Sequence, residues 1–441
     1  MASTRITRTL SANGDKKLTI SVWLKRSGLG AAQYICRVFS DANNQGGLYF
    51  TSGDNIEWFD YVGGAYKLRY ITNAVFRDTS AWYHILAHFD NSLSTPEAKL
   101  YVNGVEQSLS TSTNYTQNQT TSWNNNYTFD IGSAATGTYF DGSMTHFYFI
   151  QNQKYAPTIF GETDSTSGIW KPKTSPTIDY SATGSNSCFL KFDDSSDMDK
   201  DSGDNTLSFT TTGTLTQTED TPSNNFATLN PINNYYPEAT FSNGNLKITT
   251  KESAPVMSTL GVSSGKWYWE VKVNSLAGNY ANLGIVGTQA TASTQYISAN
   301  ANEYMYYSQG GLYYNGGSIS SGYASYTAND IIGVAMDLDN NRLFFSKNGT
   351  WQNSADPTTS TGAYTITAPA STSLGAYFPA ISYWDDNDVA NGTYEANFGN
   401  GYFGTSAVAS SNSDSAGLGL FEYSVPSGYY ALCTKNIKNY G

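Results

Sequence analysis

The sequence is poor in cysteine, with Cys36, Cys188 and Cys433 as the only three in 441 residues. An odd and widely spaced set does not make a disulfide framework, and the spacings are not those of a zinc site. We therefore expect three thiols that pack as small apolar side chains, in a chain made in a reducing cytoplasm.

Charge is also sparse, and positive charge is the sparser sign. Charged residues are 14% of the chain, and 24 Lys and Arg against 36 Asp and Glu give a net charge of −12. Nucleic-acid binding needs a Lys/Arg footprint on phosphates, so this balance argues against it, and against docking on anionic lipid. The longest apolar runs fall well short of the roughly 20 residues that span a bilayer, and the N-terminus lacks an apolar stretch, so we expect no membrane insertion and no secretory signal.

The sequence is rich in residues that form strands and turns. It has 34 Tyr, 21 Phe and 9 Trp, which suit a pleated surface, and 40 Gly, which with Asn, Ser and Asp supply turns. Residues 18–24 (Leu-Thr-Ile-Ser-Val-Trp-Leu) and 266–273 (Lys-Trp-Tyr-Trp-Glu-Val-Lys-Val) alternate with a period of two, and Asn103-Gly104 marks a tight hairpin. The pattern predicts an all-β chain of sandwiches.

Changes in composition divide the chain into four segments. Residues 1–155 and 231–405 carry the strand patterns of two sandwiches. Residues 156–230 are rich in Thr, Ser, Asp and Pro, and we interpret them as a connector whose two short strand-like pieces complete a neighbouring sheet. Residues 406–441 form a C-terminal tail.

Short sequence motifs in the two predicted sandwiches are similar to motifs of known families. The first segment resembles a laminin-G-like module of the concanavalin A-like lectin/glucanase superfamily, in Ile-Ser-Val-Trp-Leu (20–24), Trp-Tyr-His-Ile (82–85), Leu-Tyr-Val-Asn-Gly (100–104) and Phe-Asp-Gly (140–142). The third resembles a SPRY domain, in Trp-Tyr-Trp-Glu-Val (267–271), Gly-Val-Ala-Met-Asp-Leu (333–338), Phe-Phe-Ser-Lys-Asn-Gly (344–349), Phe-Pro-Ala (378–380) and Asn-Phe-Gly (397–399). Both resemblances imply concanavalin A-like jelly-roll β-sandwiches.

Two further stretches resemble SPRY-containing structural proteins of tailed, especially marine, bacteriophages. They are residues 220–231 and 420–436. This resemblance implies a virion protein made in the bacterial host cytoplasm, with other virion proteins as partners. It also implies a homo-oligomer, with a trimer as the form expected of a fibre.

Catalytic patterns are missing from the sequence. Glycoside hydrolysis needs a pair of carboxyl groups, and glucanases of the resembled superfamily carry Glu-x-Asp-x-Glu on one strand, a word that this chain lacks. On a strand, Glu57 and Asp60 would point to opposite faces. His84 and His88 would lie about 13 Å apart on a strand, too far to share a metal ion. We expect no enzyme.

Two aromatic clusters are candidate ligand sites, because rings stack on sugars while amides and carboxylates bind hydroxyl groups. The first is the loop Trp384, Asp385, Asp386, Asn387 and Asp388. The second is the tyrosine string Tyr304, Tyr306, Tyr307, Tyr313 and Tyr314. The alternatives are an ordinary polar loop for the first and cross-strand pairing within a sheet for the second.

Calcium is the one candidate ion, and we otherwise expect no cofactor. Asp197, Asp199 and Asp201 alternate as in a calcium loop, but Gly203 falls one place late and a closing Glu is missing. The alternative is a solvated acidic loop.

These observations favour a non-enzymatic bacteriophage virion protein of the tail-fibre or adhesin type, which presents lectin-like domains to a host-surface glycan or receptor. The first alternative is a purely structural capsid decoration, head fibre or tail connector. The second is a polysaccharide depolymerase.

Overall fold

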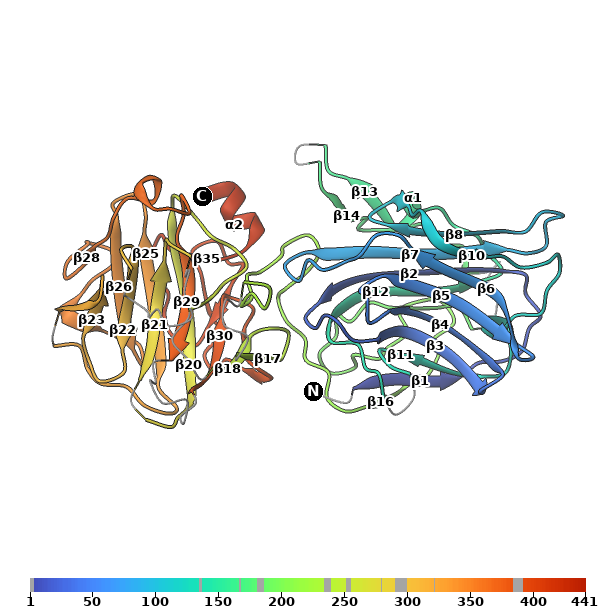
Figure 1. The fold of residues 1–441 in the computed structure, drawn as a ribbon, viewed down its shortest axis with the longest axis horizontal. Helices are drawn as coiled ribbons and strands as arrows, with labels where there is room; N and C mark the ends of the chain where they lie inside the picture. The colour runs from blue at the N-terminus through green and yellow to red at the C-terminus, as the bar shows by residue number, and fades with distance from the viewer. Residues whose placement is uncertain are drawn as a thin grey trace. The chain divides into compact units, whose positions relative to one another are not determined.

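The computed structural model describes residues 4–134, 137–165, 168–180, 186–233, 239–250, 255–278, 280–289, 300–320, 322–383 and 392–441. Strands make up 46% of the chain and helices 5%, so the all-β prediction is confirmed. The chain forms two compact units, residues 1–217 and 218–441 (Figure 1).

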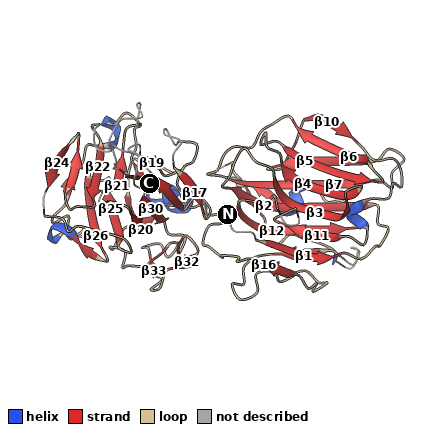
Figure 2. Cartoon of the chain, turned by 60° about the horizontal axis from the view of Figure 1, so that its bottom comes forward, coloured by secondary structure: helices blue, strands red, loops and turns tan. Residues whose placement is uncertain are grey.

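Unit 1 is a sandwich of an eight-stranded and a six-stranded sheet. In spatial order, the eight-stranded sheet is β10 (Leu109–Thr113), β6 (Ala65–Thr72), β5 (Ile56–Val62), β4 (Asn44–Phe50), β3 (Gln33–Asp41), β11 (Thr128–Ile131), β1 (Arg5–Thr9) and β16 (Thr210–Thr212) (Figure 2). The six-stranded sheet is β15 (Cys188–Leu190), β12 (Gly142–Gln151), β2 (Lys17–Arg26), β7 (Trp82–Asp90), β8 (Glu97–Val102) and β9 (Val105–Glu106).

The core of unit 1 lies between these sheets and follows the predicted alternation. Leu18, Ile20, Val22 and Leu24 of β2 are fully buried in it. Asn103 and Gly104 both take positive φ values, 50° and 79°, in the turn between β8 and β9, as the Asn-Gly hairpin predicts.

The predicted connector does not form a separate segment. One of its predicted strand-like pieces, residues 188–192, contributes β15, which pairs with β12; the other, residues 207–210, forms no strand except at Thr210, where β16 begins and pairs with β1. The units divide between Gln217 and Thr218, and Phe226 bridges to Cys433 within unit 2. Apolar side chains in the connector thus bind it to one sandwich or the other.

Part of the connector packs over the outer face of the six-stranded sheet. This covering segment, residues 153–165 and 168–180, contains α1 (Pro157–Phe160), β13 (Gly161–Thr163) and β14 (Trp170–Pro172), which lie beside β7 and β8 (Figure 1). Phe160 is buried against Leu86, Tyr148 and Ile150 of that outer face. The sheet is therefore apolar on both sides, and the chain itself covers the second side.

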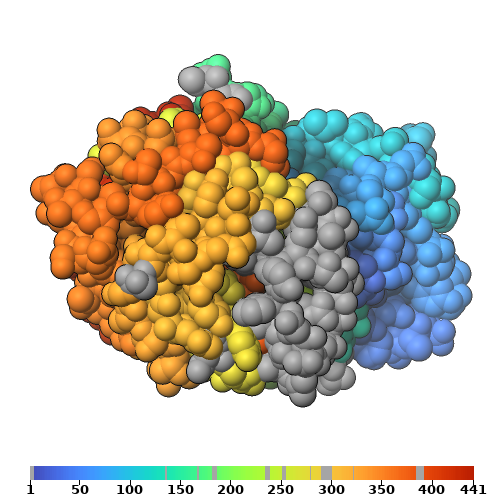
Figure 3. Space-filling view, turned by 60° about the vertical axis from the view of Figure 1, so that its left-hand side comes forward, coloured from blue at the N-terminus to red at the C-terminus, as the bar shows by residue number. Residues whose placement is uncertain are grey.

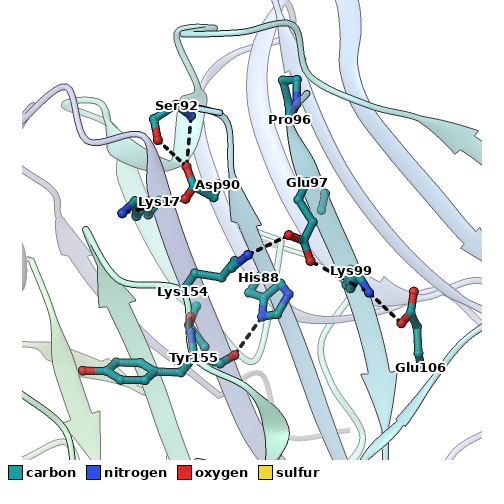
Figure 4. A network of polar contacts seen from close by, with 12 residues as sticks. Lys17, His88, Asp90, Ser92, Pro96, Glu97, Lys99, Glu106, Lys154 and Tyr155 are labelled. Carbon is teal, nitrogen blue, oxygen red and sulfur yellow. Dashed lines mark hydrogen bonds and ion pairs between the residues drawn. The ribbon is translucent and has the colours of Figure 1, made fainter. Parts of the chain in front are cut away.

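A polar network fixes the start of the covering segment (Figure 4). Lys154 Nζ lies 2.6 Å from Glu97 Oε2 on β8. His88 Nδ1 donates to the carbonyl oxygen of Tyr155 at 2.7 Å. Because Glu97 lies on β8 and His88 on β7, these two contacts bind the segment to the sheet before α1 begins.

Unit 2 is also built from two main sheets, and Figure 3 shows one side of it. One contains β17 (Thr240–Ser242), β18 (Lys247–Thr250), β30 (Gly392–Asn397), β20 (Lys266–Leu276), β25 (Ile331–Asp337), β26 (Arg342–Lys347), β27 (Thr350–Trp351), β28 (Tyr364–Thr365) and β35 (Tyr430–Ala431). The other contains β19 (Val256–Met257), β29 (Phe378–Tyr383), β21 (Ala281–Val286), β22 (Glu303–Tyr307), β23 (Leu312–Tyr314) and β24 (Gly317–Ser320).

The predicted tail packs onto unit 2. Its β32 (Ser406–Ala407) pairs with β31 (Tyr402–Phe403), which precedes the tail; the tail then forms the pair β33 (Asn412–Ser413) with β34 (Leu420–Phe421), contributes β35, and ends in α2 (Thr434–Tyr440). Glu270 on β20 accepts the backbone N–H groups of Glu422 and Tyr423, each at 2.9 Å, and burial raises the pKa of this carboxyl to about 7. The tail is therefore part of the second sandwich.

Candidate functional site

The outer face of the eight-stranded sheet carries aromatic and charged side chains. We call this set the aromatic face; it consists of Tyr34, Arg37, Phe39, Gln45, Tyr49, Glu57, Phe59, Tyr61, Tyr66 and Arg69. The strands β3, β4, β5 and β6 that carry it lie side by side (Figure 2).

Strand register explains why these residues share one side. Arg37, Gly47, Phe59 and Arg69 are successive partners across β3, β4, β5 and β6, so their side chains point the same way. A register shift between Tyr34 and Cys36 inserts one extra residue in β3. Tyr34 consequently joins Arg37 on the outer side, although they are three residues apart.

The rings pack against one another across three strands. Tyr34 and Tyr49 stack with centroids 4.5 Å apart, and Phe59 meets Tyr49 and Tyr66 edge-on at 6.0 and 6.1 Å. A Cβ atom at Gly47 would lie 2.6 Å from Phe59 and 2.7 Å from Tyr34, so only glycine lets both rings rest on β4. Neighbouring rings thus hold each other in place.

One carboxylate of the aromatic face is nearly buried and has its partners. Glu57 is 4% exposed and accepts hydrogen bonds from Tyr49 Oη at 2.7 Å and Arg69 Nε at 2.8 Å. Burial and the Glu57 carboxylate raise the pKa of Tyr49, and the hydrogen bond to Glu57 raises that of Arg69. The Arg69 guanidinium also lies 4.6 Å from the centre of the Tyr66 ring.

The aromatic face remains open where the opposite face of the sandwich is closed. Tyr34, Phe39, Tyr49 and Tyr61 are half-buried, and Tyr66 is 42% exposed. Among the described residues of unit 1, these rings belong to none of the clusters of buried apolar side chains, whereas the covering segment and the six-stranded sheet share one. Phe59 is buried at 7% exposure, so the accessible part of this face is Tyr66 with the half-buried rings beside it, an arrangement that suits a binding surface.

The tyrosine string of unit 2 forms part of the fold. Tyr304 and Tyr306 are 2% and 0% exposed and lie in the core. Tyr304 stacks on Tyr314 at 4.6 Å, and Tyr307 meets Tyr313 edge-on at 5.2 Å. These contacts are cross-strand pairs within the sheet, which is the alternative interpretation of the tyrosine string. Tyr304 and Tyr306 have no exposed ring to offer a ligand.

The other predicted ligand loop, Trp384 to Asp388, lies outside the described residues. Near the tyrosine string there is instead an open depression of about 360 Å³. Lys347 lines it, but its Nζ already donates to the Ser325 carbonyl at 2.8 Å and pairs with Asp330 at 3.1 Å. The other lining residues are Ser308, Gln309, Ser325, Tyr326 and Thr327.

The predicted calcium ligands do not converge. Asp201 uses its carboxylate to accept the backbone N–H groups of Phe189, Gly203 and Leu207, at 2.8 to 2.9 Å. Asp199 accepts from Thr211 Oγ1 at 2.6 Å, and Asp197 is exposed. In the part of the chain that the structure describes, no three acidic, His or Cys side chains are grouped to hold a metal.

His84 and Ser21 are in contact on the covered face, but the hydrogen bonds oppose nucleophilic catalysis. His84 lies between Trp23 and Trp170, and Trp170 Nε1 donates to its Nδ1 at 3.0 Å. An indole N–H only donates, so the neutral ring carries its proton on Nε2 and donates it to Ser21 Oγ at 2.8 Å. Such a histidine does not withdraw a proton from Ser21, and burial lowers its pKa to about 3.

The acidic residues of β5 point to opposite faces, as predicted. Glu57 belongs to the aromatic face, whereas Asp60 is fully buried inside and accepts from Tyr115 Oη at 3.0 Å and the Ser122 backbone. Burial raises the pKa of Asp60 to about 7. The pair cannot flank one glycosidic bond from two sides of a sheet.

Sequence reasoning missed the aromatic face. Residues 56–62 (Ile-Glu-Trp-Phe-Asp-Tyr-Val) are apolar or aromatic on both sides, a pattern that does not separate an inner from an outer side. The signal that could have found it is the pair of opposite charges Glu57 and Arg69, because a carboxylate and a guanidinium that bind each other mark the outer side of the two strands.

Family models match both units. Residues 3–157 match a model of the concanavalin A-like lectin/glucanases superfamily, and residues 266–399 match the SPRY domain. No curated protein matches the chain. Among the described residues, no helix has the length and apolarity needed to cross a membrane.

Several solved structures resemble parts of the chain at low identity. The SPRY domain of human HERC1 is 17% identical, with 36% of this chain and 91% of that one covered and a TM-score of 0.28. Stonustoxin is 20% identical, with 39% of this chain and 27% of the toxin chain covered and a TM-score of 0.28. The match therefore spans about a quarter of the toxin's length. A SAP-like pentraxin from Limulus polyphemus is 15% identical, with 34% of this chain and 70% of that one covered and a TM-score of 0.26. By its family models, this chain carries a concanavalin A-like domain followed by a SPRY domain.

Proposed function

We propose that this protein is a non-catalytic binding protein whose aromatic face binds a host-surface glycan. The observation that carries the proposal is that one outer face of unit 1 is covered by its own chain, while the other carries packed, half-buried rings and the exposed Tyr66. Aromatic rings with amide, carboxylate and guanidinium groups beside them suit a saccharide, which has apolar faces and hydroxyl edges.

Substituting the most exposed ring tests the proposal. Tyr66→Ala removes a side chain that is 42% exposed, and Tyr440→Ala removes one that is 41% exposed in unit 2. On a glycan array, the full-length protein and Tyr440→Ala should bind the same glycans, and Tyr66→Ala should bind them at least tenfold more weakly. Equal loss in both variants, or no bound glycan at all, would contradict the proposal.

We extend the proposal to host attachment on a bacteriophage particle, with the chain as a homo-oligomer, such as a trimer, among other virion proteins. The support is the resemblance of residues 220–231 and 420–436 to phage structural proteins. Several weak sites on one oligomer would bind a cell surface strongly through effective concentration. Antibody labelling of intact particles tests the extension: label at the tail tip supports it, and label absent from particles overturns it.

A further inference from the structure

Resting on the proposed function, we infer that the aromatic face selects acidic saccharides and that Arg37 binds their carboxylate. Arg37 differs from the other charged groups of this face because it forms no ion pair in the described part of the chain: burial lowers the pKa of its guanidinium, and the charges of Tyr34 and Asp130 act on it only in the opposite direction. Among the described residues, no carboxylate lies within 4.0 Å of its guanidinium nitrogens. Its Nη2 donates to a neutral amide, Gln45 Oε1, at 2.7 Å.

The neighbouring acids do not form an ion pair with Arg37. Asp130 is the strand partner of Arg37, but it is 1% exposed, and its Oδ1 lies 3.7 Å from Arg5 Nη1 without a hydrogen bond. Glu57 accepts from Arg69 and Tyr49, one donor on each of its oxygens. With the Arg5–Asp130 pair beside them, Arg37, Arg69 and Glu57 give three positive and two negative charges, a sum of +1 on a protein whose net charge is −12.

Stacking holds the Arg37 guanidinium in place for a ligand. The group lies 4.0 Å from the centre of the Phe39 ring and 6.0 Å from that of Tyr34, and its Nε is buried without a hydrogen-bond partner. A planar guanidinium fixed on a ring loses little freedom when it forms the paired hydrogen bonds that match a carboxylate. A sugar carboxylate beside Arg37 would leave the sugar ring over the tyrosines.

The long-range field of the protein does not prevent this selection. Repulsion from the acidic surface is screened beyond about 10 Å at 0.1 M salt, whereas a direct Arg–carboxylate contact is much less affected. We therefore expect the preference for acidic saccharides to persist at physiological ionic strength.

The test compares one saccharide in two charge states. Oligogalacturonate and its methyl ester share ring and length, and titration calorimetry with the full-length protein in 0.15 M salt gives the affinity for each. We expect at least tenfold tighter binding of the acid, a preference that Arg37→Gln abolishes and that Arg342→Gln, a half-buried arginine of unit 2, keeps.

Each other outcome overturns the inference. If acid and ester bind equally, and both lose affinity in Tyr66→Ala, the face binds sugars without charge selection and the proposed function stands. If neither form binds, this inference fails, and the glycan array decides the proposed function separately. If polyglutamate binds as tightly as the acid, with the same loss in Arg37→Gln, the site takes acidic polypeptide instead.

Discussion

The two outer faces of unit 1 are both aromatic, yet only one is covered by the chain. On the six-stranded sheet, Tyr148 stacks on Phe189 at 4.0 Å and lies beneath Phe160 of the covering segment. On the eight-stranded sheet, Tyr34 and Tyr49 stack in the same way but remain half-buried. The difference teaches that aromatic content alone does not mark a binding surface; a surface is available when no other part of the chain occupies it.

Removing the anchor of the covering segment should give the largest effect. Phe160→Ala deletes a side chain that is 2% exposed, and we expect unit 1 to lose about 3–5 kcal/mol of unfolding free energy. Urea unfolding followed by tryptophan fluorescence measures this. A loss below about 1 kcal/mol would mean that the segment only rests on the sheet.

Acid should weaken the covered face through His84. Burial lowers the pKa of His84 to about 3, whereas the unfolded chain binds the proton near 6.5, so stability is present above pH 6.5 and is lost as pH falls toward 3. Wild type should lose about 2 kcal/mol more than His84→Gln between pH 6.5 and 4.5. Equal unfolding midpoints in urea at both pH values, for both proteins, would contradict this account.

A methyl group at Gly47 should disturb the aromatic face from below. Gly47→Ala places a Cβ atom against Phe59 and Tyr34, and we expect a loss of about 1–3 kcal/mol together with weaker glycan binding. The matched control is Gly137→Ala, whose Cβ would meet no atom within 4 Å. Thermal unfolding and the glycan array report on both; unchanged binding by Gly47→Ala would show that ring placement is unimportant.

Truncating an exposed ring should change stability least. Tyr66→Ala removes edge contacts with Phe59 and Tyr61, each worth about 0.5–1.5 kcal/mol at most, and it frees the Arg69 side chain. We expect a stability loss of about 1 kcal/mol beside a large loss of glycan binding. The same urea experiment checks it, and a loss as large as that of Phe160→Ala would mean that this face is structural.

The sequence was sufficient for the alternation and the turns, because these depend on neighbouring residues. Leu18 to Leu24 and Asn103-Gly104 adopt the predicted structure. The open face could not be predicted, because it depends on which strands become neighbours: Tyr34 and Arg37 share a side only through the register shift in β3. The role of Phe160 depends likewise on long-range packing, which no local pattern reveals.

Amide hydrogen exchange of the full-length protein, with and without a saturating array-selected glycan, tests the central claim most directly. We predict slower exchange in β3, β4, β5 and β6 and unchanged exchange in β2, β7 and β12. Protection confined to unit 2, or to the covered face of unit 1, would contradict the assignment of the aromatic face as the binding site.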